Sequence, residues 1–211
     1  MSESVDSRTR AAGLLRALGH EFVSRELSGD QLEEISGVVS SLLAQLHDAP
    51  PRIQSIGSAP LDAFGATIPH YGSGPPRHLF ADSIVSGGAN PLGLGAYLWR
   101  DGDQAVMEVT LGAAFEGAPG RAHGGIVAAL IDETMGLVLS IHGTMAFTAQ
   151  LDISYRAATP VRVPLTSRAW LESQSGRKMR MRAVVTANGE TLAEATSLFL
   201  AIDPAKFFLR E

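Results

Sequence analysis

The segment from Phe115 to Ser140 constrains the fold of this chain more than any other stretch. It begins with a Gly/Pro-rich approach, continues with His123-Gly124-Gly125 and ends in an apolar run that one acidic pair, Asp132-Glu133, interrupts. The apolar residues of this run occupy every side of a helix, which predicts a helix buried in its own domain. Two glycines directly before it leave backbone N–H groups uncovered at the positive end of the helix, where an anion or a polarised carbonyl is favoured.

Strand patterns flank this helix on both sides. Two strands are predicted before it, joined by the turn Asp101-Gly102-Asp103, and four after it, with turns at 173–176 and at Asn188-Gly189. The predicted ranges are 96–100, 104–111, 146–156, 163–172, 178–187 and 191–202. In the strand at 146–156, strict alternation puts Thr148 on the polar face. Six strands joined mostly by hairpins predict one antiparallel sheet, and the helix is the natural cover for its apolar face.

The first half of the chain divides into two parts. Apolar residues at helical spacing predict two amphipathic helices within residues 1–49, the second capped by Ser28 or Asp30. We expect them to pack on the main domain or on a partner subunit. Residues 50–92 are rich in Pro and Gly, which is typical of a linker or a lid. The predicted organisation is therefore a helical extension (1–49), this linker (50–92), a main domain (93–203) and a tail (204–211).

Composition excludes several classes of function. The net charge of −5 and the lack of a basic run argue against a nucleic-acid partner. The chain has no Cys, which excludes disulfides, Cys-ligated zinc and a Cys nucleophile. The N-terminus lacks the apolar core of a signal peptide, and no apolar stretch reaches the length of about 20 residues that a membrane span needs. A soluble, cytoplasmic protein is expected.

A sheet wrapped around one long helix is the hotdog fold, and the residues themselves carry a family resemblance. The stretch FEGAPGRAHGGIVAALIDETMG resembles the signature of PaaI-type hotdog acyl-CoA thioesterases, in particular the mitochondrial long-chain subgroup. FTAQLDISYR resembles the strand that supplies an active-site Thr there, and SGRKMR resembles a Gly-Arg-Lys turn of the family. The resemblance covers about residues 90–203. It implies an α+β hotdog fold with an antiparallel six-stranded sheet, preceded here by an N-terminal helical extension.

Thioester hydrolysis needs a donor for the developing oxyanion and a carboxylate that acts as general base or as nucleophile. Gly124 and Gly125 offer the donor, and Asp132 offers the carboxylate. Eight residues of helix separate Gly124 from Asp132, about 12 Å at ~1.5 Å per residue, so one chain cannot bring both to one carbonyl. Two antiparallel copies of the helix would do so, which predicts a homodimer with shared sites. The resemblance implies the same arrangement, and dimers of this fold also pair into tetramers.

Structural readings compete with these roles. Asp132 is also explained as a carboxylate in a helix-side or solvent contact, with Glu133 as an exposed partner. His123 is better explained as a helix cap than as a proton donor. Thr148 enters as a site residue through the resemblance. Gly117 stands where many PaaI-type enzymes have an Asn or Gln that helps to place the carbonyl or the water.

Basic residues are expected to bind the phosphates of coenzyme A. The candidates are Arg156, Arg177, Lys178, Arg180 and Arg182, of which the last three alternate along one strand face. A solvated sheet face explains any single one of them equally well. No metal and no cofactor are expected, because coenzyme A is part of the substrate.

The expected function is therefore hydrolysis of acyl-CoA to a free acid and coenzyme A. The alternative is a hotdog domain that binds or senses acyl-CoA without cleaving it. A hotdog dehydratase is a third reading, although the helix carries no second acid/base His at a suitable spacing.

Overall fold

The computed structural model describes residues 2–52, 68, 70 and 81–203. Within this part of the chain, one sheet of six antiparallel strands has the order β1-β2-β6-β7-β8-β5. The strands are β1 (Tyr97–Asp101), β2 (Gln104–Thr110), β5 (Ala146–Tyr155), β6 (Pro164–Ser175), β7 (Lys178–Ala187) and β8 (Glu190–Ala201). The predicted antiparallel sheet is confirmed, and β5 forms one of its edges.

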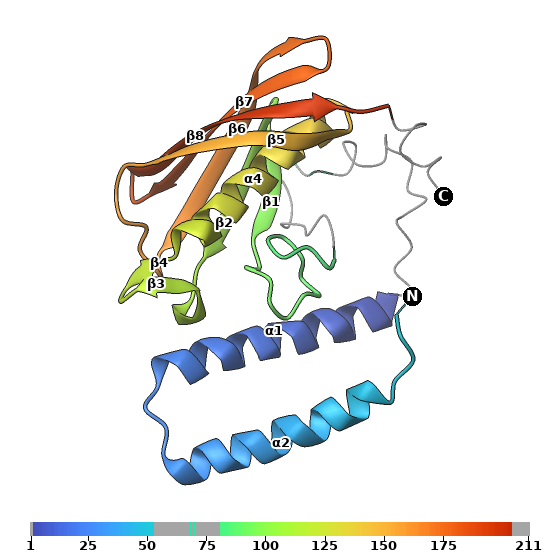
Figure 1. Ribbon diagram of the computed structural model, residues 1–211, viewed down its shortest axis with the longest axis vertical. Helices are drawn as coiled ribbons and strands as arrows, with labels where there is room; N and C mark the ends of the chain where they lie inside the picture. The colour runs from blue at the N-terminus through green and yellow to red at the C-terminus, as the bar shows by residue number, and fades with distance from the viewer. Residues whose placement is uncertain (1, 53–67, 69, 71–80, 204–211) are drawn as a thin grey trace.

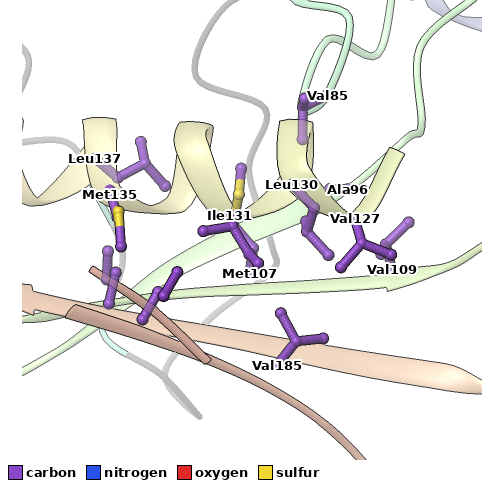
Figure 2. Packing of buried hydrophobic residues seen from close by; sticks show 14 of the residues in the cluster. Val85, Ala96, Met107, Val109, Val127, Leu130, Ile131, Met135, Leu137 and Val185 are labelled. Atoms are coloured by element: carbon purple, nitrogen blue, oxygen red, sulfur yellow. The ribbon is translucent and has the colours of Figure 1, made fainter. Parts of the chain in front are cut away.

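The long helix α4 (Gly124–Ile141) lies across the sheet, as Figure 1 shows. Its sheet-facing side contributes Val127, Leu130, Ile131 and Met135 to the core, where they meet Met107 and Val185 of the sheet (Figure 2). By length and hydropathy α4 would suffice to cross a membrane. Its contact with the sheet identifies it as the central helix of a hotdog fold, which confirms the predicted architecture.

Strands β6 and β5 differ from the sequence-based prediction in ways that concern the site and its surroundings. Strand β6 continues through Ser175, so the turn consists of Gly176 and Arg177 rather than residues 173–176. Gly176 has a positive φ of 56°, the left-handed conformation that glycine adopts without strain. The second difference is a bulge in β5, where Thr148 pairs with Phe199 and Gln150 with Leu198, so that Ala149 is the extra residue.

The N-terminal helices form as expected. Helix α2 (Gly29–His47) begins at Ser28, whose side chain and Gln31 make a capping box. Helix α1 (Ser2–Ser24) lies between α2 and the hotdog domain (Figure 1). The Arg16 side chain donates hydrogen bonds to the carbonyls of Gly88 and Asn90, which attaches α1 to the described part of residues 81–96. No residue of α2 is buried, so its apolar stripe remains open in the single chain.

Part of the predicted linker packs on the main domain. Val85, Ala89 and Leu94 are buried, in a series of turns that precedes β1. Most of residues 50–92 lies outside the described residues, as does the tail at 204–211. The proposed domain boundaries stay predictions.

Between β2 and α4 the chain makes a short 3₁₀ turn and a small two-stranded ribbon. The turn is η1 (Ala113–Phe115), and the ribbon consists of β3 (Glu116–Ala118) and β4 (Arg121–Ala122). This segment connects β2 to the first turn of α4, so it positions the start of the helix.

Candidate active site

Asp132 lies at the middle of α4, half-buried, beside the first residues of β5. The hydroxyl of Thr148 donates a 2.8 Å hydrogen bond to Oδ1 of Asp132. Both side chains line a cavity of about 360 Å³ whose wall also includes Leu137, Met145 and Phe199. The cavity therefore offers an oriented carboxylate next to apolar surface.

The bulge at Ala149 explains why Thr148 reaches Asp132. Strict alternation would put Thr148 on the polar face of β5 with Gln150 and Asp152, which was the sequence-based prediction. One extra residue moves each side chain that precedes it to the opposite face of the strand. Thr148 therefore faces α4, on the same side of the strand as Leu151, whereas Phe147 is turned outward and is 53% exposed. The predicted facing of Thr148 is thus wrong, because a bulge changes the direction of the side chains that precede it.

Glu133 is not the exposed neighbour that the sequence suggested. Its carboxylate accepts hydrogen bonds from the Ser83 hydroxyl at 2.5 Å, from the Ser86 N–H at 3.1 Å and from the Ser86 hydroxyl. Glu133 thus holds the turns at 81–96 on the helix. The two adjacent acids have separate partners, and only Asp132 keeps its carboxylate beside the β5 hydroxyl.

The N-terminus of α4 is capped by His123. Nδ1 of His123 accepts a hydrogen bond from the Gly125 N–H at 3.0 Å, and the His123 carbonyl accepts the N–H groups of Ile126 and Val127. Both glycines were predicted as oxyanion donors, but the Gly125 N–H already serves the cap. The Gly124 N–H has no acceptor within the described part of the chain, so Gly124 is the donor left for a ligand.

A second cavity, of about 350 Å³, opens at this helix end. Gly117, His123, Gly124 and Tyr155 are among its lining residues. The Tyr155 hydroxyl donates a 2.8 Å hydrogen bond to the Gly124 carbonyl. A Cβ on Gly117 would lie 2.9 Å from Cα of His123, so the glycine allows the cap to approach closely. Gly117 therefore lies beside the start of α4, as predicted, and its lack of a side chain leaves space for His123.

The carboxylate and the donor lie in different cavities. No residue of the cavity at Asp132 also lines the cavity at Gly124. The structure thus agrees with the helix geometry, which separates the two groups by about 12 Å. Within one chain the carboxylate and the donor are therefore two separate candidate half-sites.

The basic residues proposed for phosphate binding are not among the residues that line the two half-sites of their own chain. Lys178 and Arg180 alternate with buried residues of β7 and therefore face away from α4. Arg156 is paired with Glu194 at 2.8 Å, and Arg177 donates to the Ala201 carbonyl. Arg182, which shares the face of Lys178, is paired with Glu172. None of them lines the cavities at Asp132 or Gly124, and their role stays a prediction.

Sequence reasoning missed three contributors to the site. These are Tyr155 on the Gly124 carbonyl, the serine pair on Glu133, and His20, whose Nδ1 accepts the Ala114 N–H. Tyr155 had a weak signal, because it stands on the same strand as Thr148. The other two contacts join residues that are 47 or more positions apart, and no local sequence pattern indicates them.

Comparisons with known proteins agree on the family. Residues 119–194 match the sequence profile described as "Thioesterase superfamily". Acyl-coenzyme A thioesterase THEM4 of Mus musculus is 36% identical over 97 residues, which cover 45% of this chain and 42% of that protein. The Bos taurus protein of the same name is 31% identical over 130 residues, 60% of this chain and 54% of that protein. The chain thus spans about half the length of the curated relatives it matches.

A solved structure extends the likeness to most of the chain. The crystal structure of a thioesterase superfamily protein covers 92% of this chain and 90% of its own, with a TM-score of 0.75 at 26% sequence identity. This coverage reaches beyond the hotdog domain into the N-terminal part of the chain. The sequence resemblance to hotdog acyl-CoA thioesterases is therefore confirmed.

Proposed function

Given the thioesterase superfamily domain in this chain, we propose that it hydrolyses acyl-CoA thioesters to a free acid and coenzyme A. The observation that carries the proposal is the pair of half-sites on α4. Asp132 is held by Thr148 beside a largely apolar cavity, and the Gly124 N–H at the helix start has no acceptor among the described residues. These are the carboxylate and the oxyanion donor that acyl transfer from a thioester requires.

The two half-sites come together when two copies associate with their helices antiparallel. The Gly124 N–H of one copy would then polarise the thioester carbonyl while Asp132 of the other acts on it. Two features support this homodimer. Within the described part of the chain, strand β5 is an edge of the sheet, and an edge is where a strand of another copy can pair. The outer stripe of α4 carries Gly125, Ala129, Asp132 and Gly136, none of them fully buried in the single chain.

As a general base, Asp132 would take a proton from water while the water oxygen attacks the carbonyl carbon. The C–S bond then breaks and the leaving thiolate takes a proton. As a nucleophile, Asp132 would itself form an acyl intermediate that water cleaves. A single turnover in water labelled with oxygen-18 tests for the nucleophile, because label enters the Asp132 side chain only when water cleaves an acyl–Asp132 intermediate at the aspartyl carbonyl.

The first test compares Asp132→Asn with Asp152→Asn. Asp152 is on the same strand as Thr148, but it faces away from α4 and accepts a hydrogen bond from Gln150, so it is a matched control. Asp132→Asn should lower kcat about 100-fold or more, with KM and Tm nearly unchanged, because only proton transfer or attack is lost. Equal turnover by Asp132→Asn would exclude Asp132 as the reacting carboxylate.

The donor is tested by Gly124→Pro against Gly124→Ala. Gly124 is the first residue of α4, where Pro is well tolerated, and His123 has φ −64° and ψ 135°, which suits a residue before Pro. Both variants add a Cβ about 3.3 Å from the Tyr155 hydroxyl, but only Pro removes the N–H. Gly124→Pro should lose about 100-fold in kcat relative to Gly124→Ala.

Mixing the Gly124→Pro and Asp132→Asn proteins tests the shared site. Random exchange of subunits makes half of the dimers mixed, and each mixed dimer has one intact site, so about a quarter of the wild-type activity should return. Mixed dimers that form without regaining activity would show that each chain carries a complete site.

The alternative is a domain that binds acyl-CoA without cleaving it. Gly117 favours it, because this residue supplies no side-chain donor beside the Gly124 N–H. A thiol-trapping assay over a panel of acyl chain lengths decides between the two. Stoichiometric binding without release of free thiol would support the binding domain and contradict hydrolysis.

A further inference from the structure

The imidazole of His20, in helix α1, contacts the segment that leads into the Gly124 half-site. Nδ1 of His20 accepts a 3.1 Å hydrogen bond from the Ala114 N–H. Its ring meets the ring of Phe115 edge-on, with centroids 5.1 Å apart and an interplanar angle of 73°. A Cβ on Gly112 would lie only 2.5 Å from the imidazole, so the ring sits directly on the backbone there. His20 thus contacts η1 and the residue that caps it.

The same short segment holds His123 from its other side. The carbonyl of Phe115 accepts the His123 N–H at 2.8 Å. His123 in turn caps α4 through Nδ1 and the Gly125 N–H. Two hydrogen bonds and one 3₁₀ turn therefore connect His20 to the helix end where the Gly124 N–H is free.

We propose that His20 is a positioning residue for the reaction: by fixing η1 it fixes the Phe115 carbonyl and His123, and so the direction of the Gly124 N–H. The inference rests on the proposed hydrolysis, since only there does Gly124 act on a carbonyl. An oxyanion donor stabilises the transition state only when it points at the place where charge develops. With this role of His20, the N-terminal helix α1 completes the site from outside the hotdog domain.

The surroundings of His20 keep it suited to this task. An imidazole that accepts a hydrogen bond at Nδ1 must lack a proton there. Partial burial and the nearby guanidinium of Arg16 lower the pKa of His20, and Glu21 opposes them with a smaller effect. Glu21 itself is paired with Arg25 at 2.7 Å and is influenced by Arg162, which limits its pull on the imidazole. The neutral ring that the Ala114 N–H needs is therefore favoured at neutral pH.

Two substitutions of His20 separate its hydrogen bond from its packing. His20→Phe keeps a ring against Phe115 but has no acceptor. In His20→Asn, Oδ1 takes the place of Nδ1 and the ring is lost. Gly112→Ala disrupts the same contact from the side of η1, because the added Cβ displaces the imidazole. His47→Phe, at the exposed end of α2, is the matched control.

We expect His20→Phe and Gly112→Ala to lower kcat about tenfold with little change in KM, because small misplacements of a catalytic group are costly in rate. His20→Asn should restore kcat to within about threefold of wild type. His47→Phe should leave kcat unchanged. A fall in Tm without a fall in kcat, at a temperature where every variant is folded, would reduce His20 to a structural contact and overturn the proposal.

Amide hydrogen exchange tests the path without any substrate. His20→Phe should speed the exchange of the Ala114, His123 and Gly125 amides and leave those of β7 and β8 unchanged. Faster exchange at Ala114 alone would show that the effect stops at η1, which overturns the proposal. If wild-type protein releases no thiol but the three amides respond together, the positional path stands and the proposed hydrolysis fails.

Discussion

The hydrogen bond from Thr148 to Asp132 gives the sharpest quantitative prediction. Thr148→Val removes the hydroxyl and keeps the branched shape at an exposed strand position, so the loss of stability should not exceed what the hydrogen bond itself contributes. A hydrogen bond to a charged group contributes about 1.5–3 kcal/mol, and partial exposure of both side chains puts this one at the lower end. That value corresponds to about tenfold in rate.

A second argument gives the lower bound. Without Thr148, the Asp132 side chain is free to distribute over about three staggered rotamers, only one of which directs Oδ1 into the cavity at β5. Loss of orientation alone then costs about threefold. We therefore expect Thr148→Val to lower kcat by about three- to tenfold with KM little changed.

The assay is release of free thiol from a saturating acyl-CoA, with Tm and the size of the oligomer measured on the same samples. Thr148→Ser keeps the donor and is the matched control, so it should stay within about twofold of wild type. Two results would refute the reasoning. One is wild-type turnover by Thr148→Val, and the other is an equal loss in Thr148→Ser and Thr148→Val.

Two further predictions concern the contacts around the site. Glu133→Ala should lower the free energy of unfolding by about 2 kcal/mol in urea titrations, because it removes the carboxylate that accepts from the Ser83 hydroxyl and from the hydroxyl and N–H of Ser86. Asp132→Asn should change it by less than about 0.5 kcal/mol. Equal effects of the two substitutions would contradict this role of Glu133. The pKa of His20 is lowered in the folded protein, so the contribution of the neutral imidazole to stability is complete above its ordinary pKa of 6.5 and is lost as pH falls through the lowered value. Wild type should therefore lose more stability than His20→Asn on acidification. Parallel losses of stability in the two proteins would contradict this.

Much of the fold was predictable because local signals agree with one another. The apolar run after His123-Gly124-Gly125 predicts a central helix, and α4 begins at Gly124 as that pattern indicates. Asn188 and Gly189 both have positive φ, which explains why this pair marks the hairpin between β7 and β8. The capping box at Ser28 likewise follows from residues three apart. Such features depend on residues that are close in the sequence.

The site was predictable only in part. The residues Gly124, Asp132 and Thr148 were identified from the motif and its resemblance, and the structure places Thr148 and Asp132 in contact. The predicted direction of the Thr148 side chain was wrong, because nothing in FTAQLDISYR indicates that Ala149 is an extra residue relative to β8. A bulge is a property of the register between two strands, and it cannot be read from one of them.

By itself, the sequence determined a capped apolar helix, six strands around it, and an eight-residue spacing that prevents Gly124 and Asp132 from meeting within one chain. Tertiary structure decided which acid is held by serines, which face Thr148 takes, and that α1 contacts η1 through His20. The physical reason is that propensity and periodicity act over a few residues. Register and close approach, such as the imidazole on Gly112, are settled only when distant segments pack together.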